Sequence, residues 1–144
     1  FGNSISRCTS YHRQHQEHLN PIELIGMPYR LGANPTEHGA ADCLSLARTV
    51  LSHYNITSPE PKREWYRRLR RGDVSVFREE LSSWGIETDC LDCGVVGLCR
   101  TDGGSFGLAV WWQDGWLSFA GSEVVWSPIG GLVAVERCYR QKPS

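Results

Sequence analysis

Residues 26–43 read Gly-Met-Pro-Tyr-Arg-Leu-Gly-Ala-Asn-Pro-Thr-Glu-His-Gly-Ala-Ala-Asp-Cys, a loop rich in glycine and proline that ends at an Asp-Cys pair. An amphipathic helix is expected to begin there, because five residues fall on one helical face: Cys43, Leu46, Ala47, Val50 and Tyr54. Free N–H groups and the positive end of the helix dipole favour thiolate over thiol in a first helical turn. The stretch therefore predicts a nucleophilic cysteine; the alternative is a buried helix cysteine that only packs in the core.

The same stretch resembles the nucleophile motif of the NlpC/P60 family in its ordered residues Gly26, Pro28, Tyr29, Gly32, Gly39, Asp42 and Cys43. Members of that family are papain-like cysteine peptidases that cut the peptide stems of bacterial peptidoglycan. One departure is that Leu44-Ser45 follow the cysteine where the family usually has Ser-Gly. The resemblance implies a papain-like α+β fold, with Cys43 at the nucleophile position and a groove lined by Tyr29, Gly32, Asp42, Gly107 and Phe119.

Cysteine peptidase chemistry also needs a proton acceptor beside the thiol, usually a histidine. In the family this histidine opens a strand of the sheet, but here the matching position is Gly107, or Phe106 if the register slips by one. A second family position falls near Phe119. The five histidines are residues 12, 15, 18, 38 and 53, so none follows the Cys43 helix. His38, on the motif loop, is the remaining imidazole candidate for an atypical base, and Glu123 is a carboxylate candidate.

The intact cysteine loop and the missing histidine together predict a catalytically degenerate domain that serves binding or assembly. Small domains of this family occur in bacteriophage tails, so the resemblance suggests a virion component whose partners are other protein subunits. The alternative is an active peptidoglycan peptidase or amidase that uses Cys43 and an atypical base, with peptidoglycan peptides as its substrate.

The hydrophobic pattern predicts one α+β domain over residues 1–144, with N-terminal helices packed on an antiparallel meander. Residues 1–20 form a polar arm or helix, in which His12, His15 and His18 make a stripe that is either solvated or metal-binding. A helical turn is expected after Asn20-Pro21, and a helix capped by Asp73 is expected to stop at Gly85. Five strands are expected at Val95–Arg100, Phe106–Trp112, Trp116–Ala120, Glu123–Ser127 and Leu132–Tyr139.

The segment Lys62–Arg71 carries the strongest local charge in a chain whose net charge is −1. The overall balance gives no general attraction to nucleic acid or membranes. Three interpretations stay open for the segment: a solvated helical face, a surface for an acidic protein, or a grip on a phosphate backbone. Its arginines are Arg63, Arg67, Arg68, Arg70 and Arg71.

The chain has six cysteines and no apolar run of the roughly 18 residues that a membrane helix needs. No signal peptide is visible, which favours reduced thiols. Two alternatives stay open: a disulfide from Cys93 to Cys90 or Cys99, and a zinc site with Cys138 or Cys8 as the fourth ligand to Cys90, Cys93 and Cys99. No cofactor is expected.

Overall fold

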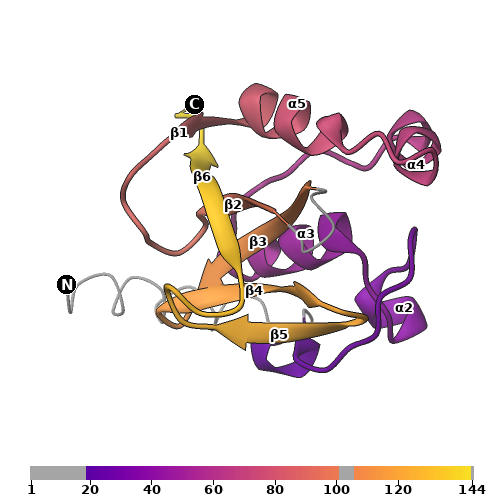
Figure 1. The fold of residues 1–144 in the computed structure, drawn as a ribbon, viewed down its shortest axis with the longest axis horizontal. Helices are drawn as coiled ribbons and strands as arrows, with labels where there is room; N and C mark the ends of the chain where they lie inside the picture. The colour runs from indigo at the N-terminus through magenta and orange to yellow at the C-terminus, as the bar shows by residue number, and fades with distance from the viewer. Residues whose placement is uncertain (1–18, 101–105, 144) are drawn as a thin grey trace.

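The computed structural model describes residues 19–100 and 106–143, and places the helices first and the strands second (Figure 1). The helical half consists of η2 (Pro21–Leu24), α2 (Pro35–His38), α3 (Cys43–His53), α4 (Arg63–Arg70) and α5 (Ser75–Trp84). The strands are β1 (Gly85–Glu87), β2 (Val96–Arg100), β3 (Phe106–Trp112), β4 (Gly115–Ala120), β5 (Glu123–Ser127) and β6 (Ala134–Gln141). The predicted α+β class is therefore confirmed. The expected histidine stripe at 12, 15 and 18 lies outside the described residues.

One antiparallel sheet contains all these strands in the order β1-β6-β2-β3-β4-β5. Strands β2 to β5 form a meander as predicted, and β3 and β5 have the expected bounds to the residue. The prediction of a meander of five strands was wrong for the last strand, because β6 pairs with β2 and β1 and not with β5. The prediction missed β1, and it placed the last strand two residues too early. Gly85 does end α5, but in extended backbone, so the chain enters β1 directly.

The hairpin between β3 and β4 shows why this turn could be predicted. Gln113 and Asp114 both have positive φ, at 51° and 59°, as a two-residue type I′ turn requires. This turn suits the right-handed twist of the two strands it joins. It brings Trp111 directly opposite Trp116.

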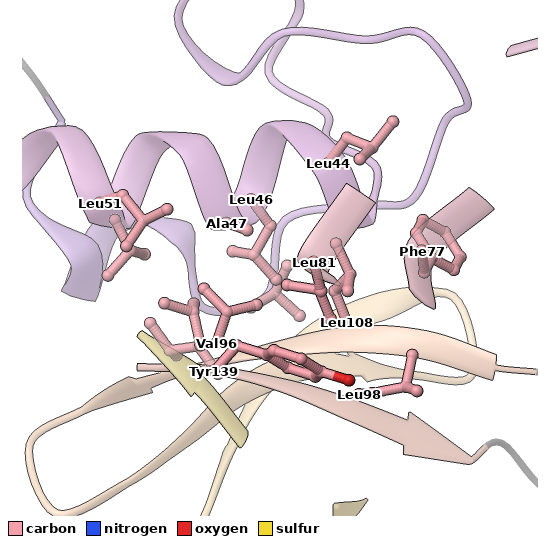
Figure 2. Close-up of a cluster of buried hydrophobic side chains, with 14 of the residues drawn as sticks. Leu44, Leu46, Ala47, Leu51, Phe77, Leu81, Val96, Leu98, Leu108 and Tyr139 are labelled. Carbon is pink, nitrogen blue, oxygen red and sulfur yellow. The ribbon is translucent and has the colours of Figure 1, made fainter. Parts of the chain in front are cut away.

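The main core lies between α3 and one face of the sheet, as Figure 2 shows. Leu46, Ala47 and Val50 are buried on α3, as their helical spacing predicts. They pack with apolar residues of the sheet and of α5: Val96, Leu98, Leu108, Val110, Leu117, Tyr139, Phe77 and Leu81. This packing holds the start of α3 beside the central strands β2 and β3.

A second, smaller core covers the opposite face of the sheet. Trp111 and Trp116 meet edge to face there, with ring centroids 5.1 Å apart, and Cys99 lies in the same cluster. Val133 and Val135 pack against it. Both faces of the sheet are therefore covered, which uses two of the tryptophans as core residues.

Local hydrogen bonds define where the helices begin. Asn20 caps η2 in a capping box with Glu23, as expected for the Asn-Pro pair. Asp73 was expected to cap α5, but the helix begins at Ser75, one residue later than that cap requires. The Asp73 carboxylate still accepts the Ser75 N–H, at 3.2 Å.

In the described part of the chain, no helix has both the length and the apolar character to cross a membrane.

Candidate functional site

Backbone hydrogen bonds hold the motif loop between the sheet and the start of α3. The N–H of Gly26 donates to the carbonyl of Val124, at 2.8 Å, which ties the loop to β5. The N–H of Arg30 donates to the carbonyl of Ala41, at 2.9 Å, just before the Asp-Cys pair. The loop therefore fixes the position of Cys43 from two sides.

Asp42 is the polar centre of this arrangement and is only 1% exposed. One carboxylate oxygen accepts the N–H of Ser45, at 2.8 Å, and the Ser45 hydroxyl accepts the N–H of Asp42, at 3.0 Å. The other carboxylate oxygen accepts the N–H of Gly32, at 2.7 Å. Gly32 turns the loop with φ of +83°, a conformation that favours glycine. Asp42 thus starts the helix and binds the loop to it.

Cys43 lines a cleft of about 540 Å³ that opens beside the start of α3. Among the expected groove residues, Tyr29, Asp42, Gly107 and Phe119 line it as well, while Gly32 lies behind Asp42. The rest of the lining comes from the loop, α3, the α4–α5 region and the sheet: Leu31, Leu44, Leu69, Val74, Phe77, Cys99, Arg100, Phe106, Ser118, Ala120, Gly121, Leu132 and Val133. The volume suits a small molecule or a short peptide segment.

Burial controls the protonation of Cys43, although the residue as a whole keeps intermediate exposure. The pKa of the thiol is raised to about 12, mainly by the loss of solvent around it, and nearby Cys99 and Asp42 contribute to the rise. A hydrogen bond from the Leu108 backbone lowers the pKa, but by less than burial raises it. Desolvation of the charged form therefore outweighs the helix terminus, which by itself would favour the thiolate.

The wall of the cleft formed by β3 presents an aromatic ring where a base was sought. Phe106 packs in the same cluster as Leu108 and Val110, so it lies on the β3 face that packs against α3. Gly107 pairs with Cys99, which belongs to the opposite face. Of the two registers considered from the sequence, position 106 is therefore the one on the side of α3.

Two guanidinium groups stack on the Phe106 ring. The Cζ atoms of Arg100 and Arg78 lie 4.7 and 5.1 Å from the ring centroid. Arg100 also pairs with Glu136, at 2.6 Å. At position 106 the described part of this wall therefore offers an aromatic ring that is covered by guanidinium groups, in place of an imidazole.

The expected substitutes for the missing base lie away from the thiol. His38 is exposed at the end of α2, where its Nδ1 accepts the N–H of Asn34, at 2.8 Å. Glu123 is exposed at the start of β5. Neither residue lines the cleft, and its described lining contains no histidine. The carboxylate there belongs to Asp42, whose two oxygens accept backbone N–H groups.

Several residues at the site were not singled out from the sequence. Ser118 donates a hydrogen bond to the Leu108 carbonyl, at 2.9 Å, and lies 3.7 Å from the Cys99 sulfur. Tyr66 approaches Asp42 and Tyr29; burial, with these neighbours, raises the pKa of its phenol to about 12. Ser118 reaches the site through strand pairing, and no local sequence pattern could indicate that pairing. Tyr66 lies three residues before Leu69, so helical spacing could have assigned it to the inner side of its helix.

The remaining cysteines only partly match expectation. Cys93 is disulfide-bonded, so the prediction of a reduced thiol was wrong for this residue. The other described cysteines (Cys43, Cys90, Cys99 and Cys138) are free, which excludes a bridge from Cys93 to Cys90 or Cys99. Within residues 19–100 and 106–143, no three metal-ligating side chains gather as a metal site.

The positions expected for a basic patch divide into two groups. Arg68 is half-buried and bound to Asp73 and Glu79, each at 2.8 Å. The others lie exposed on α4 or at its end: Arg63, Arg67, Arg70 and Arg71.

A function for the Cys43 cleft must be inferred from its own residues, because no family model matches this sequence and no curated protein matches it either.

Proposed function

We propose that this chain is a catalytically degenerate, papain-like domain of the NlpC/P60 type, whose cleft binds a peptide segment. The observation that carries the proposal is that Cys43, at the helix start, shares its cleft with Phe106, and that no histidine is among the described residues that line this cleft. A triad without its base typically loses several powers of ten in rate. Binding survives such a loss, because it needs only the shape and chemistry of the cleft.

The lining suits a peptide with both apolar and acidic character. Tyr29 and Phe119 meet edge to face, with centroids 5.2 Å apart, and offer an aromatic corner. Leu132 is 80% exposed at the lining, so burying it would favour association. Arg100 contributes positive charge. A protein subunit of a virion or phage tail is the partner that we infer from the resemblance.

Alkylation of Cys43 tests the chemical part of the proposal. At pH 7 a thiol with a pKa of about 12 should react with iodoacetamide about three powers of ten more slowly than a solvated peptide cysteine. Mass spectrometry of time points measures each site separately, and the exposed Cys90 provides an internal reference. Faster labelling of Cys43 than of Cys90 at pH 7 would contradict a resting thiol.

The second candidate function is an active peptidoglycan peptidase or amidase. The Leu108 backbone hydrogen bond favours it, because this contact lowers the pKa of the Cys43 thiol. A gel containing purified peptidoglycan separates the two candidates. The degenerate domain should leave the gel uncleared, whereas clearing that disappears in Cys43→Ala would establish the enzyme.

A further inference from the structure

Four arginines of the α4 region lie on one exposed stripe. At about 100° per residue, Arg63, Arg67, Arg70 and Arg71 fall within an arc of about 100°. The opposite side of α4 carries Trp65, which is buried, and Leu69, which lines the Cys43 cleft. The arginine stripe, as we call these four residues, therefore faces away from the cleft.

The four arginines of the stripe differ from those arginines of the chain that take part in ion pairs. Those pairs are Arg48–Glu60, Arg68–Asp73, Arg68–Glu79, Arg100–Glu136 and Arg137–Glu87. Among the described residues, no carboxylate lies within ion-pair distance of any stripe guanidinium. Like charges four residues apart on a helix repel each other and destabilise it. The stripe is thus a concentration of unneutralised positive charge in a chain whose net charge is −1.

A rigid support presents the stripe. Trp65 anchors α4 in the main core, and Lys62 lies over its ring, 5.8 Å from the centroid. Arg68 joins α4 to α5 through Asp73 and Glu79, and its guanidinium also donates to the Ser75 hydroxyl, at 2.9 Å. The stripe arginines therefore project from a backbone that is already ordered, which lowers the entropy cost of binding.

We propose that the arginine stripe docks an acidic α-helix of a partner protein. From Arg63 to Arg70 the helix rises about 10 Å, and Arg63, Arg67 and Arg70 are spaced by about 6 Å and about 4.5 Å along its axis. Carboxylates at i, i+4 and i+7 of a partner helix recur at the same intervals, and guanidinium groups bind carboxylates through paired hydrogen bonds. This inference concerns a surface separate from the cleft and does not depend on the function proposed for it.

The aromatic residues of α4 favour a protein partner over a nucleic acid. Proteins that grip single strands stack bases on exposed aromatic rings between their cationic groups. Here Trp65 is buried, and Tyr66 is half-buried beside Asp42. The stripe therefore offers charge and hydrogen-bond donors but no stacking platform.

A designed probe tests the proposal with the full chain. The probe is a fluorescent alanine-based helical peptide with Glu at i, i+4, i+7 and i+11, and anisotropy measures its binding. We expect binding at low ionic strength that fades toward about 0.5 M salt, where charges are screened over a few ångströms. Arg67→Gln with Arg70→Gln should weaken binding on the order of fivefold, since exposed pairs contribute modestly.

A matched variant and two further probes decide the outcome. Arg140→Gln with Lys142→Gln removes the same charge from exposed positions elsewhere and should leave the affinity unchanged. Circular dichroism checks that both variants are folded. Equal weakening by the two variants, or equal binding of a peptide with Gln in place of Glu, would overturn the proposal. Tighter binding of a single-stranded oligonucleotide, lost in the stripe variant, would assign the surface to nucleic acid instead.

Discussion

At the start of α3, two physical effects act on the sulfur of Cys43 in opposite directions. Helix N–H groups and the Leu108 backbone stabilise the thiolate, whereas burial stabilises the neutral thiol. Burial is the larger effect, so the pKa rises to about 12. Cys43 therefore lies at the nucleophile position as a neutral thiol and not as the thiolate that a nucleophile needs.

Placing an imidazole at position 106 should partly restore the thiolate form of Cys43. In Phe106→His the new side chain lies on the β3 face that packs against α3. An imidazole that accepts the thiol proton favours the thiolate, so we expect Cys43 to react with iodoacetamide at least about tenfold faster at pH 7. Site-resolved mass spectrometry measures the rate.

The neighbouring position supplies the control for this experiment. Gly107→His places the same imidazole at the other position considered from the sequence, on the other face of β3 beside Cys99, and should accelerate Cys43 less than Phe106→His does. Acceleration by Gly107→His alone would show that the assigned register is wrong. No acceleration in either variant would contradict the proximity of position 106 to the thiol.

At the scale of elements, the connection from α5 to β1 depends on a close approach between backbones. Gly85 pairs with Gln141 of β6, and a Cβ at Gly85 would run into the carbonyl oxygen of the neighbouring Arg140. Its φ of −133° is open to any residue, so the constraint is space rather than backbone conformation. The short β1 can pair with β6 only because no side chain separates them.

We expect Gly85→Ala to destabilise the protein by about 2 kcal/mol, the usual range for an overpacked site. Urea unfolding followed by circular dichroism measures the change in free energy. Glu87→Ala, at an exposed position of the same strand, is the control; it removes the exposed Arg137–Glu87 ion pair and should still cost much less. A stable Gly85→Ala variant would mean that β1 and β6 separate easily.

Over the whole molecule, buried acids that stay protonated make the fold sensitive to alkaline pH. Burial raises the pKa of Cys43 and Tyr66 to about 12, and it also raises that of Tyr54. When a pKa is higher in the folded state, the native protein holds a proton that the unfolded chain releases. The stabilisation is complete below the unfolded pKa, near 9 for cysteine, and is lost as the pH approaches 12.

The free energy of unfolding should therefore fall between pH 9 and 12, by up to about 1.4 kcal/mol per pH unit for the buried Cys43 thiol and by less for the half-buried Tyr66. Urea titrations at several pH values in this window measure the slope. Cys43→Ser removes a titrating group and should make the slope shallower, and Tyr66→Phe should add to that effect. An unchanged slope in both variants would show that these groups titrate alike in the folded and unfolded chains.

Much of this architecture is predictable because it depends on local patterns. The spacing of Leu46, Ala47 and Val50 predicts the buried face of α3, and the Gln-Asp-Gly turn predicts the β3–β4 hairpin. The Asp-Cys pair predicts where α3 begins. Each prediction needs only the periodicity or the turn chemistry of neighbouring residues.

Contacts between distant residues decide the rest. Strand pairing and burial place Phe106, Ser118 and Cys99 around the cleft, and they decide that the Cys43 thiol is neutral. By itself the sequence determined the helices other than α2, which lies in the expected loop, most of the strands, and the cysteine at a helix start, because short-range sterics and periodicity act within one segment. Only the tertiary structure decided what surrounds that cysteine. Desolvation, and the nearby charges that disfavour the thiolate, arise where segments far apart in the chain meet.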